Sequence, residues 1–136
     1  MAMEFDLVPP DSLVEKNGDS EPMDITASPT RTFFCLMLIT DQIEQESLDI
    51  SIWGSADGES WGTHPILKLP QSFYRGQTRA VLELSMRPEV KFIRAKWELN
   101  RWGRVAPTPM FRFGLHLLEV PAMPRQIQAV PVASAQ

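Results

Sequence analysis

Between residues 31 and 120, apolar and polar residues alternate with a period of two, and this pattern leaves few folds open to the chain. Successive side chains of a β-strand point to opposite faces of a sheet, whereas a helix repeats every 3.6 residues. The alternation therefore predicts strands that bury one face in a core. It is clearest in three segments, where we expect these side chains to face the core: Leu48, Ile50 and Ile52; Ile93, Ala95, Trp97 and Leu99; Phe111, Phe113, Leu115 and Leu117.

Three further segments have the composition of strands. Residues 32–40 are almost continuously apolar, which predicts a central strand that is covered on both faces. Residues 77–84 form another strand, and residues 67–69 lie between two prolines, which places them at the edge of a sheet. Turn residues separate these segments without a helical crossover. This organisation predicts an all-β, antiparallel, jelly-roll-like β-sandwich over residues 31–120.

The first 30 residues differ from the rest of the chain in charge. They hold seven acidic residues and one lysine, a net charge of −6, whereas the whole chain carries −4. Four prolines and few apolar residues predict an extended acidic arm without a core of its own. The alternative is that the arm lies back on its own domain, with Phe5, Leu7 and Val8 among its apolar anchors. Residues 121–136 are predicted to form a Pro-rich tail.

Basic residues concentrate next to the predicted closing strands. We expect the acidic arm of one subunit to dock on this basic face of a neighbour, because opposite charges guide association and fix its register. The assembly arm comprises Phe5, Asp6, Leu7, Val8 and Asp11. The basic docking face comprises Arg94, Lys96, Arg101, Arg104 and Arg112. Two other interpretations stay open for the basic residues, namely a site for single-stranded nucleic acid and an ordinary solvated surface.

Two stretches of the sequence resemble known jelly-roll modules. The segment from Leu48 to Trp61 contains Ser-x-Asp-Gly-x-x-Trp and resembles the strand and turn of discoidin-like domains. The segments 92–97 and 110–117 resemble the closing strand pair of the same folds. The combination is also similar to jelly-roll cement or decoration proteins of tailed phages and prophages. The resemblance implies a jelly-roll sandwich that takes part in an assembly, and a location in a capsid.

The sequence offers little for catalysis. A single cysteine, Cys35, excludes an intramolecular disulfide and lies within an apolar strand, where we expect it to be buried. His116 lies between Leu115 and Leu117, so its side chain is expected to point away from the core. No phosphate-binding loop and no metal-ligand spacing are found in the sequence. We therefore predict no enzymatic activity, no catalytic residues, no metal site and no cofactor.

The sequence predicts a non-enzymatic structural protein that self-associates or decorates a larger assembly through its terminal extensions. The alternative is a discoidin-like carbohydrate-binding module that uses exposed tryptophans for sugar stacking, with Trp53, Trp61 and Trp102 as candidates. The first residues lack the basic and apolar regions of a secretory signal, which predicts synthesis in the cytoplasm. No apolar run approaches the length of a membrane helix, so we expect no membrane partner.

Overall fold

A computed structural model describes residues 3–42, 46–101 and 110–121, with the side chain of residue 101 left out. All regular secondary structure in these ranges is β-strand, and no helix long and apolar enough to cross a membrane occurs in them. The strands are β1 (Glu4–Val14), β2 (Gly18–Asp19), β3 (Met23–Asp24), β4 (Thr32–Gln42), β5 (Glu46–Ser55), β6 (Leu67–Lys68), β7 (Gly76–Glu83), β8 (Phe92–Arg101) and β9 (Phe111–Glu119).

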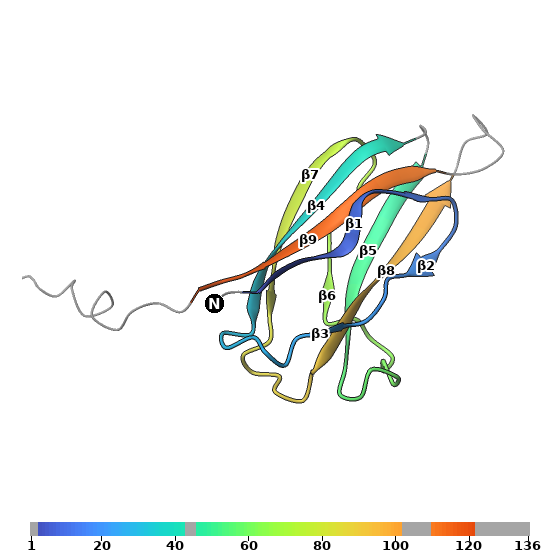
Figure 1. Cartoon of the computed structure of the whole chain (residues 1–136). Coiled ribbons are helices and arrows are strands. Elements are labelled where there is room, and N and C mark those ends of the chain that lie inside the picture. The colour runs from blue at the N-terminus through green and yellow to red at the C-terminus, as the bar shows by residue number, and fades with distance from the viewer. Residues whose placement is uncertain (1–2, 43–45, 102–109, 122–136) are drawn as a thin grey trace, which may run out of the picture.

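The strands form two antiparallel sheets that pack face to face (Figure 1). Sheet A has the order β1-β9-β4-β7, and sheet B has the order β2-β8-β5-β6, with β3 also paired to β8. The pairs are nested: β1 with β9, β2 and β3 with β8, β4 with β7, and β5 with β6. A long hairpin that is rolled into two layers gives this order, which is the jelly-roll arrangement. The predicted fold class is confirmed.

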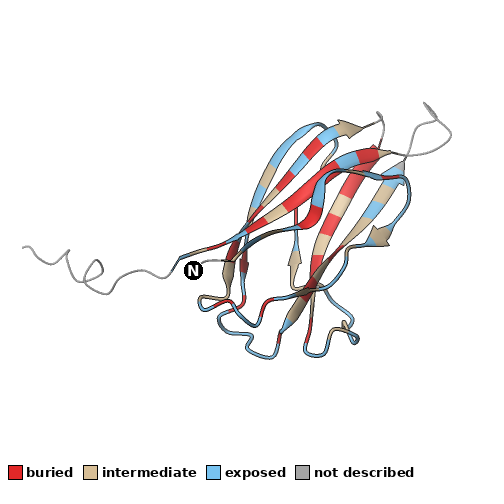
Figure 2. Ribbon diagram, in the orientation of Figure 1, coloured by how far each residue is buried: buried red, intermediate tan, exposed pale blue. Residues whose placement is uncertain are grey.

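The core lies between the two sheets, where the period-two alternation placed it. Leu48, Ile50 and Ile52 of β5 are at most 1% exposed, and the predicted inward residues of β9 are fully buried. In β8, Ile93 is fully buried, whereas Trp97 is partly buried and packs against the core. Buried residues alternate with more exposed ones along β4, and along β9 the alternation is interrupted only at Gly114, which is buried (Figure 2).

The acidic N-terminal segment is part of this sandwich, which corrects the prediction of an arm that leaves the domain. Strand β1 pairs with β9 along the edge of sheet A, and β2 and β3 pair with β8 in sheet B. Leu7 and Val8 are only 5% and 2% exposed, and the ring of Phe5 packs edge-on against Phe33 at 5.9 Å. The alternative considered from the sequence is therefore the observed one. These apolar anchors have their partners in the same chain, and the sandwich begins at Glu4.

Strand β4 is also buried differently from its prediction. Its inward side chains, such as Phe33 and Met37, are at most 2% exposed, but Phe34 and Leu38 are 51% and 39% exposed. A two-layer sandwich covers each sheet on one face only, so a strand in the middle of a sheet still has an uncovered side. The expectation that β4 is covered on both faces is wrong. The apolar composition of β4 thus places hydrophobic side chains on the outer face of sheet A.

Candidate interaction surfaces

The outer face of sheet A carries a contiguous group of apolar side chains from three adjacent strands. Phe34 and Val81 are each 51% exposed, and Leu118 is 39% exposed. A shallow groove of about 390 Å³ runs between them. Monomeric proteins rarely expose contiguous apolar patches without a function. We call this group the sheet A patch and define it by Phe34, Leu36, Leu38, Val81 and Leu118.

Charged groups flank the sheet A patch on the side of β1. The ring nitrogens of His116 lie 2.8 Å from the Asp6 carboxylate and 2.7 Å from that of Glu4. The hydrogen bond to Asp6 is the main cause that raises the pKa of His116, partial burial opposes it, and Glu4 adds to the rise. The prediction that His116 points away from the core is confirmed. The two acidic residues of the predicted assembly arm therefore have partners in sheet A. Asp6 bonds to His116, and Asp11 accepts a hydrogen bond from the Thr40 hydroxyl.

The outer face of sheet B holds a different cluster, made of two indole rings and two cations. The Lys96 ammonium lies 4.5 Å from the ring centre of Trp53, and the Arg94 guanidinium lies 4.4 Å from that of Trp61. Arg94 also forms an ion pair of 3.3 Å with Asp19 on β2. Four of the residues predicted for docking or ligand binding therefore come together on one face. Each cation is held against an aromatic ring by cation–π attraction.

The Ser-x-Asp-Gly-x-x-Trp turn positions Trp61 on this face. The Asp57 carboxylate accepts hydrogen bonds from the backbone N–H groups of Ser60 and Glu59, and then from the Ser55 hydroxyl. These bonds lower the pKa of Asp57 to about 2. Gly58 follows with a φ of 81°, a conformation that favours glycine. The residues that carry the resemblance to jelly-roll modules thus form a capped turn after β5.

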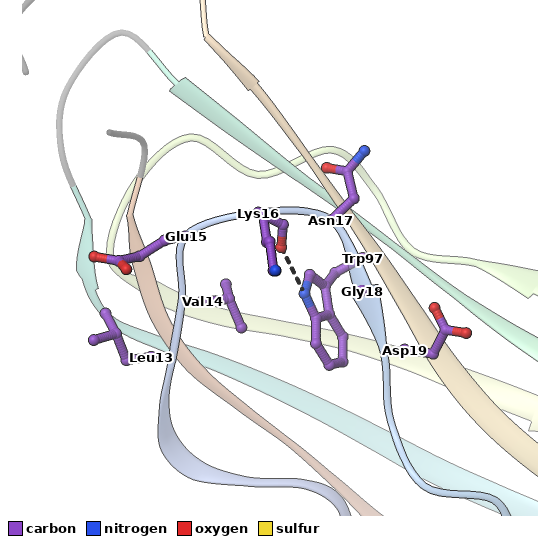
Figure 3. A pocket seen from close by; sticks show the side chains of 8 residues that line it. All are labelled: Leu13, Val14, Glu15, Lys16, Asn17, Gly18, Asp19 and Trp97. Atoms are coloured by element: carbon purple, nitrogen blue, oxygen red, sulfur yellow. Dashed lines mark hydrogen bonds between the residues drawn. The ribbon is translucent and has the colours of Figure 1, made fainter. Parts of the chain in front are cut away.

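A pocket of about 590 Å³ lies where the turn between β1 and β2 passes Trp97 (Figure 3). The Trp97 Nε1–H donates to the backbone carbonyl of Lys16 at 3.1 Å, and a Cβ at Gly18 would lie only 3.0 Å from the ring. The indole also packs edge-on against Phe113, with 5.8 Å between the ring centres. Trp97, predicted as a core residue, therefore joins the core to a surface pocket. A second cleft of about 280 Å³ continues from it toward Trp53 and Lys96.

The predicted basic docking face does not form one surface. Arg94 and Lys96 lie on sheet B, whereas Arg112 is exposed on β9 of sheet A, so the two sheets separate them. The backbone of Arg101 ends β8, and its side chain is outside the described residues. Trp102 and Arg104 also lie outside the described residues, as does the tail 122–136. The prediction of a continuous basic face is corrected, because strand pairing assigns its members to different sheets.

Glu119 is a buried acid that sequence reasoning missed. Glu119 is 1% exposed and its carboxylate accepts hydrogen bonds from Met3 N–H, from the Ser28 hydroxyl, and from both the N–H and the hydroxyl of Thr30. Burial by itself raises the pKa of such a carboxyl, but the hydrogen bonds outweigh it and lower the pKa to about 2. Its position in the sequence could have predicted this burial, because residue 119 continues the series of inward-facing residues 111, 113, 115 and 117.

The thiol of Cys35 lies inside the sandwich, as predicted. It is 1% exposed, and burial raises its pKa to about 12, so its nucleophilic thiolate form is scarce near neutral pH. The imidazole of His116 faces outward from the same sheet. The two groups therefore lie on opposite faces of sheet A.

Comparison with known proteins gives no family for this chain. No protein-family model matches the sequence, and no curated protein matches it significantly. A proposal for its function therefore has to start from the two outer faces.

Proposed function

We propose that this protein is a non-enzymatic structural protein that associates with copies of itself through the outer face of sheet A. The observation that carries the proposal is the exposure of the sheet A patch, with Phe34 and Val81 each about half exposed. A second copy supplies a surface of the same shape and the same apolar character. Association in this way joins two rigid sandwiches into a dimer.

The energetics of burial favour such an association. Two sheets pack face to face at a spacing of about 10 Å when their facing side chains interdigitate. Fully burying an exposed Val, Leu or Phe side chain stabilises by roughly 1.5–3 kcal/mol, and a half-exposed one contributes about half of that. Several such side chains per copy therefore offset a substantial part of the entropy lost on association. Carboxylates lie on the β1 side of the patch and Arg79 lies on β7, with His116 between them, so the charges surround the apolar residues in part, as in the polar rim of a protein interface.

The proposal moves the assembly function from the terminal arm to a face of the sandwich. The N-terminal segment contributes to this face as strand β1, with Asp6 and Glu4 beside the patch. The resemblance to decoration proteins implies attachment to a larger shell through the terminal extensions. The outer face of sheet A is suited to such a role as well, because it is apolar and bordered by charge.

Sedimentation velocity on the full chain tests the proposal. We expect a concentration-dependent dimer that Val81→Ser weakens by about tenfold in Kd, because each dimer loses two buried valine side chains. Met86→Ser is the matched control, because Met86 is 85% exposed but lies outside the sheet A patch, in the loop between β7 and β8. Circular dichroism confirms that both variants keep the fold. A chain that stays monomeric up to about 1 mM, or a Val81→Ser variant that associates like the parent chain, contradicts the proposal.

A second candidate function is carbohydrate binding at the outer face of sheet B. It is favoured by the cleft of about 280 Å³ that Trp53 lines together with polar groups such as Ser51 and Glu98. An indole ring beside hydrogen-bonding groups is the composition that sugar recognition requires. A glycan array probed with the full chain tests this function. Binding that Trp53→Ala abolishes and Val81→Ser leaves intact supports it, whereas an array without specific binding rejects it.

A further inference from the structure

The strand register sets the outer face of sheet A in straight rows that run across the strands. One row joins β1, β9, β4 and β7, because Asp6 pairs with His116, His116 with Leu36, and Leu36 with Arg79. The row beside it follows from the same pairings and consists of Glu4, Leu118, Phe34 and Val81. Each row thus has a carboxylate at its β1 end. The centre of the first row holds His116 and Leu36, and the centre of the second row is apolar. The first row ends in a cation at β7.

The two ends of the first row carry opposite charge. Asp6 and Glu4 share the single imidazole of His116, so this end stays negative even when His116 is protonated. At the other end Arg79 is exposed, and its guanidinium donates a hydrogen bond of 3.3 Å to the neutral amide of Gln77. Within the part of the chain that the structure describes, no carboxylate forms an ion pair with Arg79. The Arg79 charge is therefore available to a partner.

Two twofold arrangements align the strands of two stacked copies, and the charges distinguish them. An axis perpendicular to the strands, along the row, places Asp6 over Asp6 and Arg79 over Arg79. An axis parallel to the strands, between β9 and β4, reverses the row and places Asp6 over Arg79 of the other copy. Like charges that face each other across an interface destabilise it, and opposite charges favour its formation. The second arrangement forms the Asp6 contact with Arg79 twice, because a twofold interface repeats every contact.

We infer that two copies of this chain pack sheet A on sheet A about a twofold axis that runs parallel to the strands between β9 and β4. Asp6 of each copy then faces Arg79 of the other. In the neighbouring row, Leu118 of each copy faces Phe34 of the other, and the side chain of Glu4 lies over Val81 of the other copy. The apolar contact is therefore the one between Leu118 and Phe34, which the twofold axis repeats. The inference rests on the proposed function, in which a second copy binds this face, and it adds the orientation and the residues that select it.

Charge reversal of the two ends tests the arrangement by sedimentation velocity on the full chain. We expect Arg79→Glu and Asp6→Lys each to raise the dimer Kd on the order of 10–100-fold, because each homodimer then has two pairs of like charges. An equimolar mixture of the two variants is expected to form a 1:1 dimer, because all charges at the row ends are again opposite. Lys68→Glu and Glu98→Lys on sheet B are matched controls that change the net charge equally and leave the dimer unchanged.

Salt dependence provides a second readout that does not rely on the folding of Asp6→Lys. Raising the ionic strength from about 0.05 to 0.5 M is expected to weaken the parent dimer and to strengthen the Arg79→Glu dimer, since attraction and repulsion are both screened. A dimer that Val81→Ser disrupts but that neither charge reversal nor salt affects overturns the arrangement and leaves the proposed function standing. A parent chain that stays monomeric overturns both. A dimer that is lost only when residues 122–136 are removed would show that the tail, rather than contact between the two sheet A patches, holds the copies together. That result overturns the inference.

Discussion

The carboxylate of Glu119 accepts a hydrogen bond of 2.8 Å from the backbone N–H of Met3, so the end of the last strand is tied to the start of the first. The second oxygen accepts bonds from Ser28 and Thr30, in the segment that precedes β4. A single buried carboxylate thus joins β9 to two earlier segments of the chain. The two ends of the rolled hairpin, the start of β1 and the end of β9, lie side by side at this point.

We expect Glu119→Gln to lower the free energy of unfolding by about 1–3 kcal/mol at pH 7, because the amide presents donors to groups that are themselves donors. The pKa of Glu119 is lowered from its ordinary value of 4.5 to about 2. Its stabilising effect is therefore complete above pH 4.5 and is lost as the pH falls toward 2. Urea unfolding of both proteins at pH 7, 4 and 2.5 measures this. A difference in stability that is as large at pH 2.5 as at pH 7 contradicts the assigned role.

His116 is expected to titrate above 6.5, because hydrogen bonds to Asp6 and Glu4 favour its protonated form and raise its pKa. A raised pKa stabilises the fold fully below pH 6.5, and this contribution is lost as the pH rises through the folded value. The ring-proton shift of His116 in NMR spectra of a dilute sample gives the midpoint. Asp6→Asn is expected to move the midpoint down toward 6.5, and Glu98→Gln on sheet B is the control. An unchanged midpoint in Asp6→Asn contradicts the assigned contact.

The edge of sheet A depends on a close approach between two backbones. A Cβ at Gly114 would lie 2.7 Å from the Cα of Pro10 and 3.3 Å from the carbonyl oxygen of Pro9. Gly114→Ala is therefore expected to push β1 away from β9 and to cost about 1–3 kcal/mol of stability. Because the clash is with backbone atoms, Pro10→Ala in the same chain should not restore stability. Full rescue by Pro10→Ala would mean that the proline ring, rather than the backbone, limits the space.

The strands that the sequence predicted best are those with an uninterrupted alternation. In β5 and β9 every second residue of the pattern lies on the inner face of its sheet, and residues such as Ile50 and Leu115 are buried as expected. Strand β1 was missed because its register shifts between Asp6 and Val8 and again between Val8 and Ser12. Such bulges break the period of two and admit prolines at an edge strand. The apolar anchors of β1 were recognised, but the pattern that would have placed them in a sheet was hidden.

Two properties of the candidate surfaces depend on how the strands pair, and the sequence patterns could not predict them. The apolar strand β4 was predicted to be covered on both sides, since composition does not tell how many layers a fold has. The contact of Lys96 with the Trp53 ring on sheet B depends on the pairing of β5 with β8. The same pairing rules separate Arg112 from Arg94, although the two are only 18 positions apart. The chemistry of each residue was predictable, whereas its neighbours were not.

Phe33 and Phe34 are adjacent in β4 and provide a direct comparison of the two faces of sheet A. Phe33 is fully buried in the core, and Phe34 is 51% exposed at the centre of the sheet A patch. Phe33→Ala is expected to cost about 3–5 kcal/mol of monomer stability, the usual result of a large cavity in a core. Phe34→Ala should cost less than about 1 kcal/mol, because no cavity forms on an open face.

Urea unfolding at a protein concentration far below the dimer Kd measures the monomer alone, and sedimentation at high concentration measures association. Phe34→Ala is then expected to leave the first measurement almost unchanged while weakening the second. A Phe34→Ala chain that is destabilised as strongly as Phe33→Ala would show that the outer face of sheet A is covered within the monomer. In that case the sheet A patch would belong to the fold of one chain rather than to an interface between two, because the same side chain cannot be buried by both.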